Sequence, residues 1–283
     1  MTQDRLGTLL VTGAAVAWST TGLFTRALHL DAATMLVWRG VFGALGLVLV
    51  IGWLQGRAGF AGFARLGPAG WAYALISGAS MLCFIASLTL TTVAHVAIIY
   101  AVVPFLAAGL GWLILHDRPS LLAILASGAA LFGAVIMVGL SRDGSSIGDL
   151  LALGMTFGMA VLMVISRAAP GIPTLPAATM SALLAAIAAW PFAAALSVSM
   201  PQAAGLVAFG LVNSALGLAL FLQGSARIAP VKTALITALD APLAPLWVWL
   251  FLSETPSMAT LVGGVIVMAA VIAYILGDRP RPT

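Results

Sequence analysis

Apolar residues occur along this chain in long runs rather than in an alternating pattern. Residues 121–140, for example, would be apolar on every face of a helix. A strand of a membrane β-barrel would alternate over about 10 residues, whereas a membrane-spanning helix needs roughly 20 apolar residues. The runs are separated by short segments that carry turn-forming or charged residues. The pattern predicts ten membrane-spanning helices, at residues 6–28, 33–54, 68–90, 93–115, 120–140, 148–166, 175–196, 203–224, 230–252 and 258–276.

The shortest break in this pattern separates the third predicted helix from the fourth. It falls at residues 90–93, next to Thr89, Thr91 and Thr92. We expect two separate spans here. One kinked helix is the alternative, and it would change the count of ten.

The composition supports a membrane location. Of 283 residues, 62% are hydrophobic and 7% are charged, against about 25% charged in an ordinary soluble domain. The single cysteine, Cys83, excludes an intrachain disulfide or a Cys-rich metal site, and we interpret it as a small buried apolar residue. The basic residues are scattered, so the net charge of +4 does not indicate nucleic-acid binding.

The distribution of arginine predicts the orientation in the membrane. If the N-terminus is cytoplasmic, eight arginines fall in inner segments and two in outer segments, which matches the excess of positive charge in cytoplasmic loops. Both termini are therefore predicted to be cytoplasmic, and the first span lacks a signal-peptide cleavage pattern. The inner residues are Arg5, Arg57, Arg65, Arg118, Arg167, Arg227, Arg279 and Arg281, and the outer ones are Arg26 and Arg142.

An internal repeat divides the chain into two groups of five spans. The segment 7–10 (Gly-Thr-Leu-Leu) recurs at 148–151 (Gly-Asp-Leu-Leu). Residues 112–120 share Trp, Leu, an acidic residue and Pro-Ser with residues 249–257, at a separation of 137. Several matches in chain order indicate a duplication.

The predicted halves are residues 1–141 and 147–279. Because five is odd, the second half must cross the membrane in the opposite direction. Inverted repeats of this kind are typical of secondary transporters, which place the substrate between the halves.

These segments resemble the ten-helix EamA-type branch of the drug/metabolite transporter superfamily. The resemblance rests on residues 104–120 and 242–257, each with a proline, an apolar run and an acidic turn, and on the small polar stretch 18–22. This chain keeps Glu254 but has Asp117 in the first half, and it lacks the small glycine before each acid.

The resemblance implies an alternating-access carrier of small metabolites in a bacterial inner membrane, either linked to protons or facilitated. The overall pattern is most similar to exporters of aromatic and other neutral amino acids. A multidrug carrier of the same fold, and a channel or membrane-embedded enzyme, are the alternatives. No paired carboxylates, metal-ligand cluster or phosphate-binding loop occurs in the sequence, so we expect no catalytic residue, metal or cofactor. The oligomeric state is left open, and a monomer is compatible with the sequence.

Four ionisable residues fall inside predicted spans, where charge is costly and usually faces a cavity or a partner. They are Arg39, His95, Lys232 and Asp240. His95 and Lys232 occupy equivalent places in the two halves, and either could instead reach the membrane surface. Arg39 could bind a substrate carboxylate or serve a structural role near the headgroups.

Asp240 is the deepest carboxylate and the best candidate for proton coupling. It follows Lys232 by eight residues, which places the two on different faces of the helix. The prolines at 242 and 245 would free backbone carbonyls beside it. A static ion pair with Arg39 or Lys232 is the alternative.

Further residues are candidates for the lining of a substrate cavity. Serine and threonine can instead bond to their own backbone, and large apolar residues can pack in the core or face lipid. The full set comprises Trp18, Thr21, Ser80, Met81, Phe84, His95, Tyr100, Phe157, Met163, Trp190, Asn213, Phe221 and Gln223.

Overall fold

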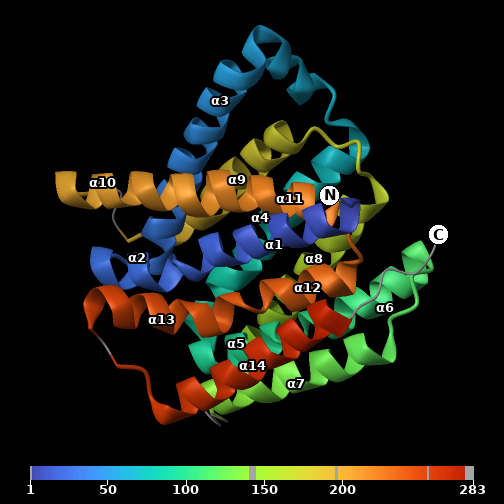
Figure 1. The fold of residues 1–283 in the computed structure, drawn as a ribbon. Coiled ribbons are helices and arrows are strands. Elements are labelled where there is room, and N and C mark those ends of the chain that lie inside the picture. Colours follow the sequence, from blue (N-terminus) through green and yellow to red (C-terminus); the bar gives the residue numbers. More distant parts are fainter. Residues whose placement is uncertain (1, 140–144, 195–196, 254, 278–283) are drawn as a thin grey trace.

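A computed structural model describes residues 2–139, 145–194, 197–253 and 255–277 (Figure 1). Over these residues the chain is helical, without strands, and ten helices are long and apolar enough to cross a membrane. The predicted helical membrane fold with ten spans is therefore confirmed. Glu254, Arg142, Arg279 and Arg281 lie outside the described residues.

Several spans consist of more than one helical segment. The elements are α1 (Gln3–Ser19), α2 (Thr21–Leu28), α3 (Ala32–Ala64), α4 (Gly67–Leu90), α5 (Val93–Tyr100), α6 (Val103–Leu115), α7 (Leu121–Val138), α8 (Ser146–Ala168), α9 (Thr174–Ala189), η1 (Trp190–Phe192), α10 (Met200–Phe209), η2 (Gly210–Leu216), α11 (Gly217–Ser225), α12 (Pro230–Thr237), α13 (Asp240–Leu252) and α14 (Met258–Gly277). Segments α1 and α2, α5 and α6, η2 with its two flanking helices, and α12 and α13 each form one span.

The separation predicted at residues 90–93 is present. Thr91 is extended, with φ −136° and ψ 176°, so α4 cannot continue through it. The Thr92 hydroxyl then accepts a hydrogen bond from the His95 amide at 3.2 Å and caps the start of α5.

The segment expected to be a loop after residue 54 is instead helical. In α3 a non-helical residue, Gly56, has φ 57° and ψ −151°, a conformation that L side chains rarely adopt. The chain bends there and helix resumes to Ala64, with Phe60 and Phe63 stacked at 6.4 Å between ring centroids. The sequence pattern predicted a break in the span here, but not the helix that follows it.

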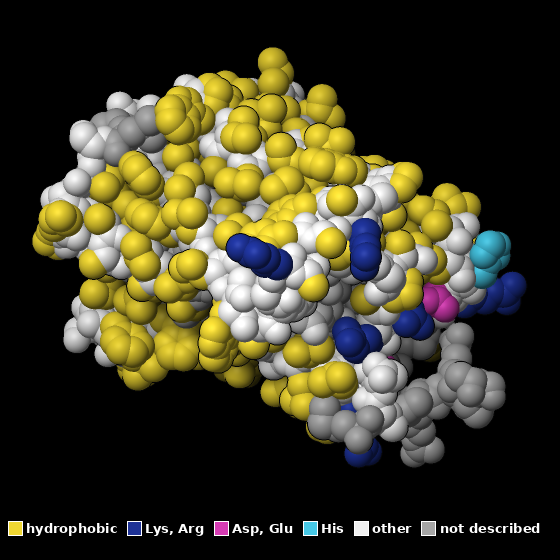
Figure 2. Space-filling model, turned by 90° about the horizontal axis from the view of Figure 1, so that it is seen from above, with side chains coloured by type: hydrophobic (Ala, Val, Ile, Leu, Met, Phe, Trp, Pro, Cys, Tyr) yellow, Lys and Arg dark blue, Asp and Glu magenta, His cyan; other side chains and the backbone are white. Residues whose placement is uncertain are grey.

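The two ends of the described chain lie at the same end of the helix bundle. The N-terminal helix and the end of α14 lie on the same side in Figure 1, as an even number of spans requires. We call this end, with Gln3 and Gly277, the terminal face, and the opposite end, with Leu28 and Val93, the distal face. In Figure 2 the basic side chains gather toward the right of the view, on the side of the terminal face. The rest of this view is largely apolar.

Close helix contacts depend on glycine. A Cβ atom added at Gly133 of α7 would lie 2.7 Å from the Gly263 carbonyl of α14, and one at Gly40 of α3 would lie 2.6 Å from the Ala182 carbonyl of α9. Such backbone approach is how helices pack in lipid, where no hydrophobic force joins them. Helices α7 and α14 accordingly lie side by side along the lower edge in Figure 1.

Candidate functional site

A central cavity of about 690 Å³ lies between the two halves of the chain. Its lining comes from the end of α1, α2, the first part of α3, most of α4, and α5, α8, α9, the end of α10, η2, α11 and the first part of α13. It includes the exposed residues Thr25 and Ala32, on either side of the α2–α3 connection. The cavity therefore reaches from the middle of the bundle to the distal face.

Toward the terminal face the space between the helices is filled by apolar side chains. Val11, Ile228 and Leu235 pack together with residues of α7 and α14. Tyr73 and Leu222 pack in a second cluster and are 1% and 3% exposed. The cavity is closed on this side.

Arg39 of α3 lines the cavity. Its terminal nitrogen donates to the Asn213 side-chain oxygen at 2.9 Å, and its guanidinium carbon lies 5.5 Å from the centre of the Phe209 ring. Its Nε is buried and has no hydrogen-bond partner within the described part of the chain. A buried, unsatisfied donor of a charged group is costly, so the site favours an anionic acceptor.

Asn213 connects three spans beside this arginine. It lies in η2, a π-helical segment, and its amide nitrogen donates to the Ala17 carbonyl and to the Thr21 hydroxyl, both at 3.0 Å. The Trp18 indole in turn donates to the Asn213 carbonyl at 3.0 Å. These bonds tie the π-helical segment to the end of α1 and the start of α2, and π turns are frequent at functional sites.

Asp240 lines the same cavity from the first turn of α13. It directly follows the break between α12 and α13, at Ala238 and Leu239, and Pro242 comes next in the helix. Tyr100, the last residue of α5, lines the cavity at the corresponding break of the first half. A carboxylate and a guanidinium are thus both presented to one cavity.

Most of the large side chains in the remaining wall are aromatic residues or methionines. The rings of Trp18 and Phe221 lie 4.9 Å apart between centroids, and Phe209 stacks on Phe24 at 4.9 Å. Other apolar lining residues are Met35, Met81, Phe84, Met155 and Met159. Such a wall suits an apolar group of varied shape, because methionine adapts its conformation readily.

Most of the residues proposed from the sequence line this cavity. Those that do are Trp18, Thr21, Arg39, Ser80, Met81, Phe84, Tyr100, Asn213, Phe221 and Asp240. Those that lie elsewhere are His95, Phe157, Met163, Trp190, Gln223 and Lys232.

The residues that lie elsewhere have identifiable surroundings. Phe157 and Trp190 are 48% and 58% exposed on the outer surface, and Met163 is fully buried against α6 and α11. Gln223 lines a separate small pocket of about 80 Å³ near the terminal face.

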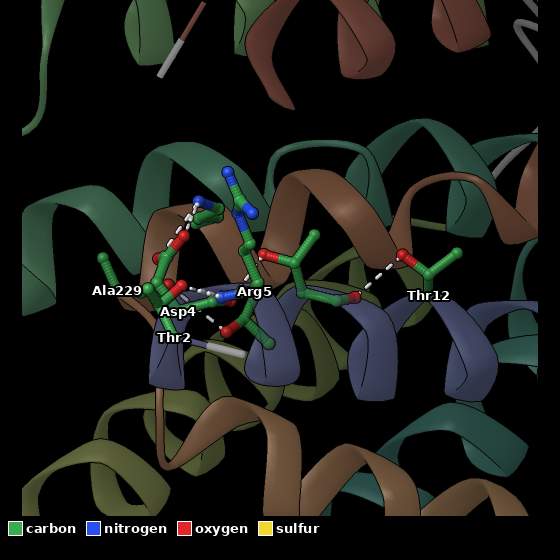
Figure 3. A network of polar contacts seen from close by, with 8 residues as sticks. Thr2, Asp4, Arg5, Thr12 and Ala229 are labelled. Atoms are coloured by element: carbon green, nitrogen blue, oxygen red, sulfur yellow. Dashed lines mark hydrogen bonds and ion pairs between the residues drawn. The ribbon is translucent and has the colours of Figure 1, made fainter. Parts of the chain in front are cut away.

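The two equivalent basic residues of the fourth and ninth spans form ion pairs outside the cavity. Lys232 binds Asp4 at 3.0 Å rather than Asp240. His95 lies 2.9 Å from Asp149. The pair considered between Asp240 and Lys232 is therefore absent, because Lys232 points to the N-terminus of α1. Figure 3 shows the contacts around Asp4 at this terminal face.

The sequence missed several lining residues that helical spacing could have found. Tyr73 and Ser77 lie on the same face of α4 as the proposed Ser80 and Phe84, at intervals of three and four residues. Ser181, whose buried hydroxyl has no partner among the described residues, faces the cavity from α9. No pattern in the sequence distinguishes it from other small residues of that span.

Ten membrane-length helices around a mainly apolar cavity with a few charged and polar side chains are typical of a multi-pass membrane carrier. The EamA-like transporter family matches residues 5–139 and again residues 146–276, and the chain belongs to that family. It is accordingly a membrane transporter of small metabolites.

Comparison with solved structures agrees on the fold. One crystal structure superposes with a TM-score of 0.82, covering 98% of this chain and 100% of the other, at 20% sequence identity. At that identity the likeness shows the fold alone. No curated protein matches the sequence.

Proposed function

We propose that this protein exports small zwitterionic metabolites, amino acids first among them, by alternating access between two inverted halves. The observation that carries the proposal is that Arg39 and Asp240 both line one mainly apolar cavity. Arg39 has a donor to spare for a carboxylate, and Asp240 offers an acceptor to an ammonium group. The aromatic and methionine wall between them suits a neutral or aromatic side chain.

Two observations support the inverted repeat. The family matches the chain twice, once in each half. The helices α5, α6 and α7 begin at residues 93, 103 and 121, and α12, α13 and α14 begin 137 residues later, at 230, 240 and 258.

The proposed setting is a bacterial inner membrane with cytoplasmic termini. The basic side chains seen toward the terminal face in Figure 2 support this orientation. The cavity would then face outward, in the state that releases an exported substrate.

Counterflow in proteoliposomes, with each of the twenty radiolabelled amino acids, tests the substrate class. We expect saturable exchange of neutral or aromatic amino acids, and Arg39→Gln should weaken it by about tenfold or more, since a charge-assisted hydrogen bond is lost. Decarboxylated amines, which lack the group that Arg39 would bind, should exchange equally in both proteins. Absence of saturable exchange for every amino acid would reject the proposal.

A multidrug carrier is the second candidate, favoured by the methionine-rich apolar wall. Lipophilic cations would then be exchanged faster than any amino acid, and Arg39→Gln would leave that exchange unchanged or improve it. A channel would give flux that does not saturate.

A further inference from the structure

Two ion pairs join the halves of the chain at opposite ends of the bundle. At the terminal face the Lys232 ammonium, 5% exposed, lies 3.0 Å from the Asp4 carboxylate. This pair connects the start of α12 to the start of α1. At the distal face His95 Nδ1 lies 2.9 Å from Asp149 Oδ1, which connects the start of α5 to the start of α8. The Thr91 hydroxyl donates to the same carboxylate at 2.8 Å.

The two pairs correspond in the repeat. His95 and Lys232 are separated by 137 residues, and each is the third residue of its helix. Asp4 and Asp149 each lie in the first turn of the first helix of the opposite half. An aspartate at a helix N-terminus is also favoured by the helix dipole, so each pair is held by two electrostatic effects.

A close backbone contact accompanies each pair. A Cβ atom added at Gly7 would lie 2.7 Å from Ile228, and one added at Gly148 would lie 2.6 Å from Thr91. Ile228 and Thr91 are again 137 residues apart, and each lies two residues before the start of its helix, α12 or α5. Charge and glycine contact therefore fasten each broken helix to the other half at the same point.

Both pairs are formed in one structure whose cavity reaches only the distal face. Val96 and Ala97, next to His95, line the cavity, yet the His95–Asp149 pair is intact. If the two pairs served as alternating gates, the pair at the open, distal face would be separated in this structure. The two contacts therefore do not follow the opening of the cavity.

The backbone is interrupted beyond each contact. In the first half the Val102 amide bonds to the Ile99 carbonyl at 3.1 Å, in an i to i−3 pattern, before Pro104. In the second half Leu239 bonds to Ile236 at 3.1 Å in the same pattern, before Pro242. Proline cannot donate to the preceding turn, so each helix can bend here at low cost.

We propose that the Asp4–Lys232 and His95–Asp149 pairs are fixed pivots of the transport cycle. The breaks at residues 101–102 and 238–239 are the hinges, so that α6 and α13 swing while α5 and α12 stay attached to the opposite half. This role rests on the transport function proposed above. The four charged residues act on transport by positioning helices and do not touch the substrate.

Cross-linking distinguishes a pivot from a gate, because the two predict opposite results. In a Cys83→Ala background, Asp4→Cys with Lys232→Cys, and separately His95→Cys with Asp149→Cys, are joined after reconstitution by a short bifunctional methanethiosulfonate, which forms two reducible disulfides with release of methanesulfinate. The readout is phenylalanine counterflow, or that of the amino acid the wild-type protein exchanges fastest. We expect exchange to stay within about twofold of the reduced sample, as for an element that does not move in a hinge motion.

A matched cross-link at the distal mouth gives the contrast. A Cβ atom at Gly22 of α2 would lie 3.7 Å from Ala244 Cβ of α13, a separation that a disulfide bridges. Gly22→Cys with Ala244→Cys should lose exchange by at least about tenfold when oxidised, because it fixes a moving segment, and regain it on reduction.

Each outcome decides the matter. Retained exchange in both pivot cross-links, or exchange lost in the double variant and restored by the cross-link, supports the pivots. Loss on cross-linking that returns on reduction identifies a gate and overturns them, as does a loss that neither state restores.

A second measurement separates this proposal from the proposed function. Spin-label distances in liposomes need no substrate: labels at Gln3 and Ala226, beside the terminal pivot, should give one narrow distance. Labels at Ala27 and Leu250, on α2 and α13, should give two populations. If no amino acid is exchanged but the distances behave in this way, the substrate proposal fails and the pivots stand. Two populations at the pivot would overturn the pivots alone.

Discussion

The fourth span and the ninth span break in the same place but carry different chemistry. Each consists of a short helix, a two-residue interruption and a 13-residue helix, α6 or α13. Both end in a left-handed residue, His116 with φ 59° and Ser253 with φ 57°. After the break, however, the first half has Val103 and the second has Asp240. The backbone shape is shared, while the ionisable group that faces the cavity is present once.

This difference shows how two halves with a similar backbone can form an asymmetric site. Proline and turn residues preserve the interruption in both halves, because its geometry depends on backbone hydrogen bonds. The side chains at the interruption are free to differ. A zwitterion has two unlike ends, so a site for it cannot be built from two identical halves.

Removal of the carboxylate that follows the second interruption should have the largest effect. Asp240→Asn should lower transport driven by a pH gradient by about hundredfold, since an amide cannot carry a proton. Val103, at the equivalent position, is 2% exposed in an apolar cluster, so the control there is Val103→Thr, which keeps the shape of the side chain and should have little effect. The measurement is amino-acid transport in proteoliposomes with and without a pH gradient. Unchanged gradient-driven transport in Asp240→Asn would remove Asp240 from proton coupling.

The two ion pairs offer a comparison of stability. Asp4→Asn removes a carboxylate 3.0 Å from an ammonium that is 5% exposed, and should lower the free energy of unfolding by about 2 kcal/mol, as for a buried charge that loses its partner. Asp149→Asn should cost about 1 kcal/mol or less, because its partner His95 is more exposed, at 20%.

Thermal unfolding in detergent, monitored by fluorescence of a thiol-reactive or intrinsic probe, measures both. Asp117→Asn, in the exposed loop after α6, serves as a control for a lost surface charge. Equal losses in the two pair variants would contradict the difference in burial.

Restoring helical continuity should affect the two interruptions alike. Pro104→Ala and Pro242→Ala each return a backbone donor, so each should stiffen its span and slow exchange by about tenfold without loss of stability. Counterflow rate and melting temperature, measured on the same preparation, report the two effects. Pro119→Ala, in a connection between spans, is the control. Faster exchange in either variant would show that the interruptions are not hinges.

The smallest expected effect concerns the start of the two helices. Thr92 caps α5 with its side chain, whereas the equivalent Ala229 gives α12 no side-chain cap. Thr92→Ala should cost about 1 kcal/mol, and Ala229→Ser should stabilise by a few tenths of that amount. Melting temperature resolves the sign, and stabilisation by Thr92→Ala would contradict the assigned cap.

The spans were predictable because burial in lipid demands long apolar runs. Even the narrow separation at residues 90–93 was visible, since several threonines and a change of pattern mark it. The helix after Gly56 was not, because its glycine-rich composition, with a charged Arg57, resembles a loop. The π turn was not either: it depends on contacts between Asn213 and α1 that no local pattern encodes.

The candidate site was predictable where a polar residue stood out in an apolar span. Arg39, Asn213 and Asp240 all line the cavity for this reason. Aromatic residues gave no comparable signal, because lipid and an apolar cavity are about equally favourable surroundings for an apolar side chain. Phe157 and Trp190 accordingly face outward. The partner of Lys232 could not be found either, since Asp4 lies 228 residues away in the chain.

The π turn at Gly210–Leu216 has a consequence for how this chain can vary in evolution. A π turn holds an extra residue relative to an α-helix, so deleting one residue would leave a regular helix. The flanking helices would keep their orientation, but residues within the turn would shift around the helix axis by up to about 100°. Asn213 would then lose its contacts with Arg39, Trp18 and Thr21 at the same time. Substitutions on the outer side, such as at Leu211, which is 43% exposed, should accumulate freely among relatives, while the length of this segment should not change.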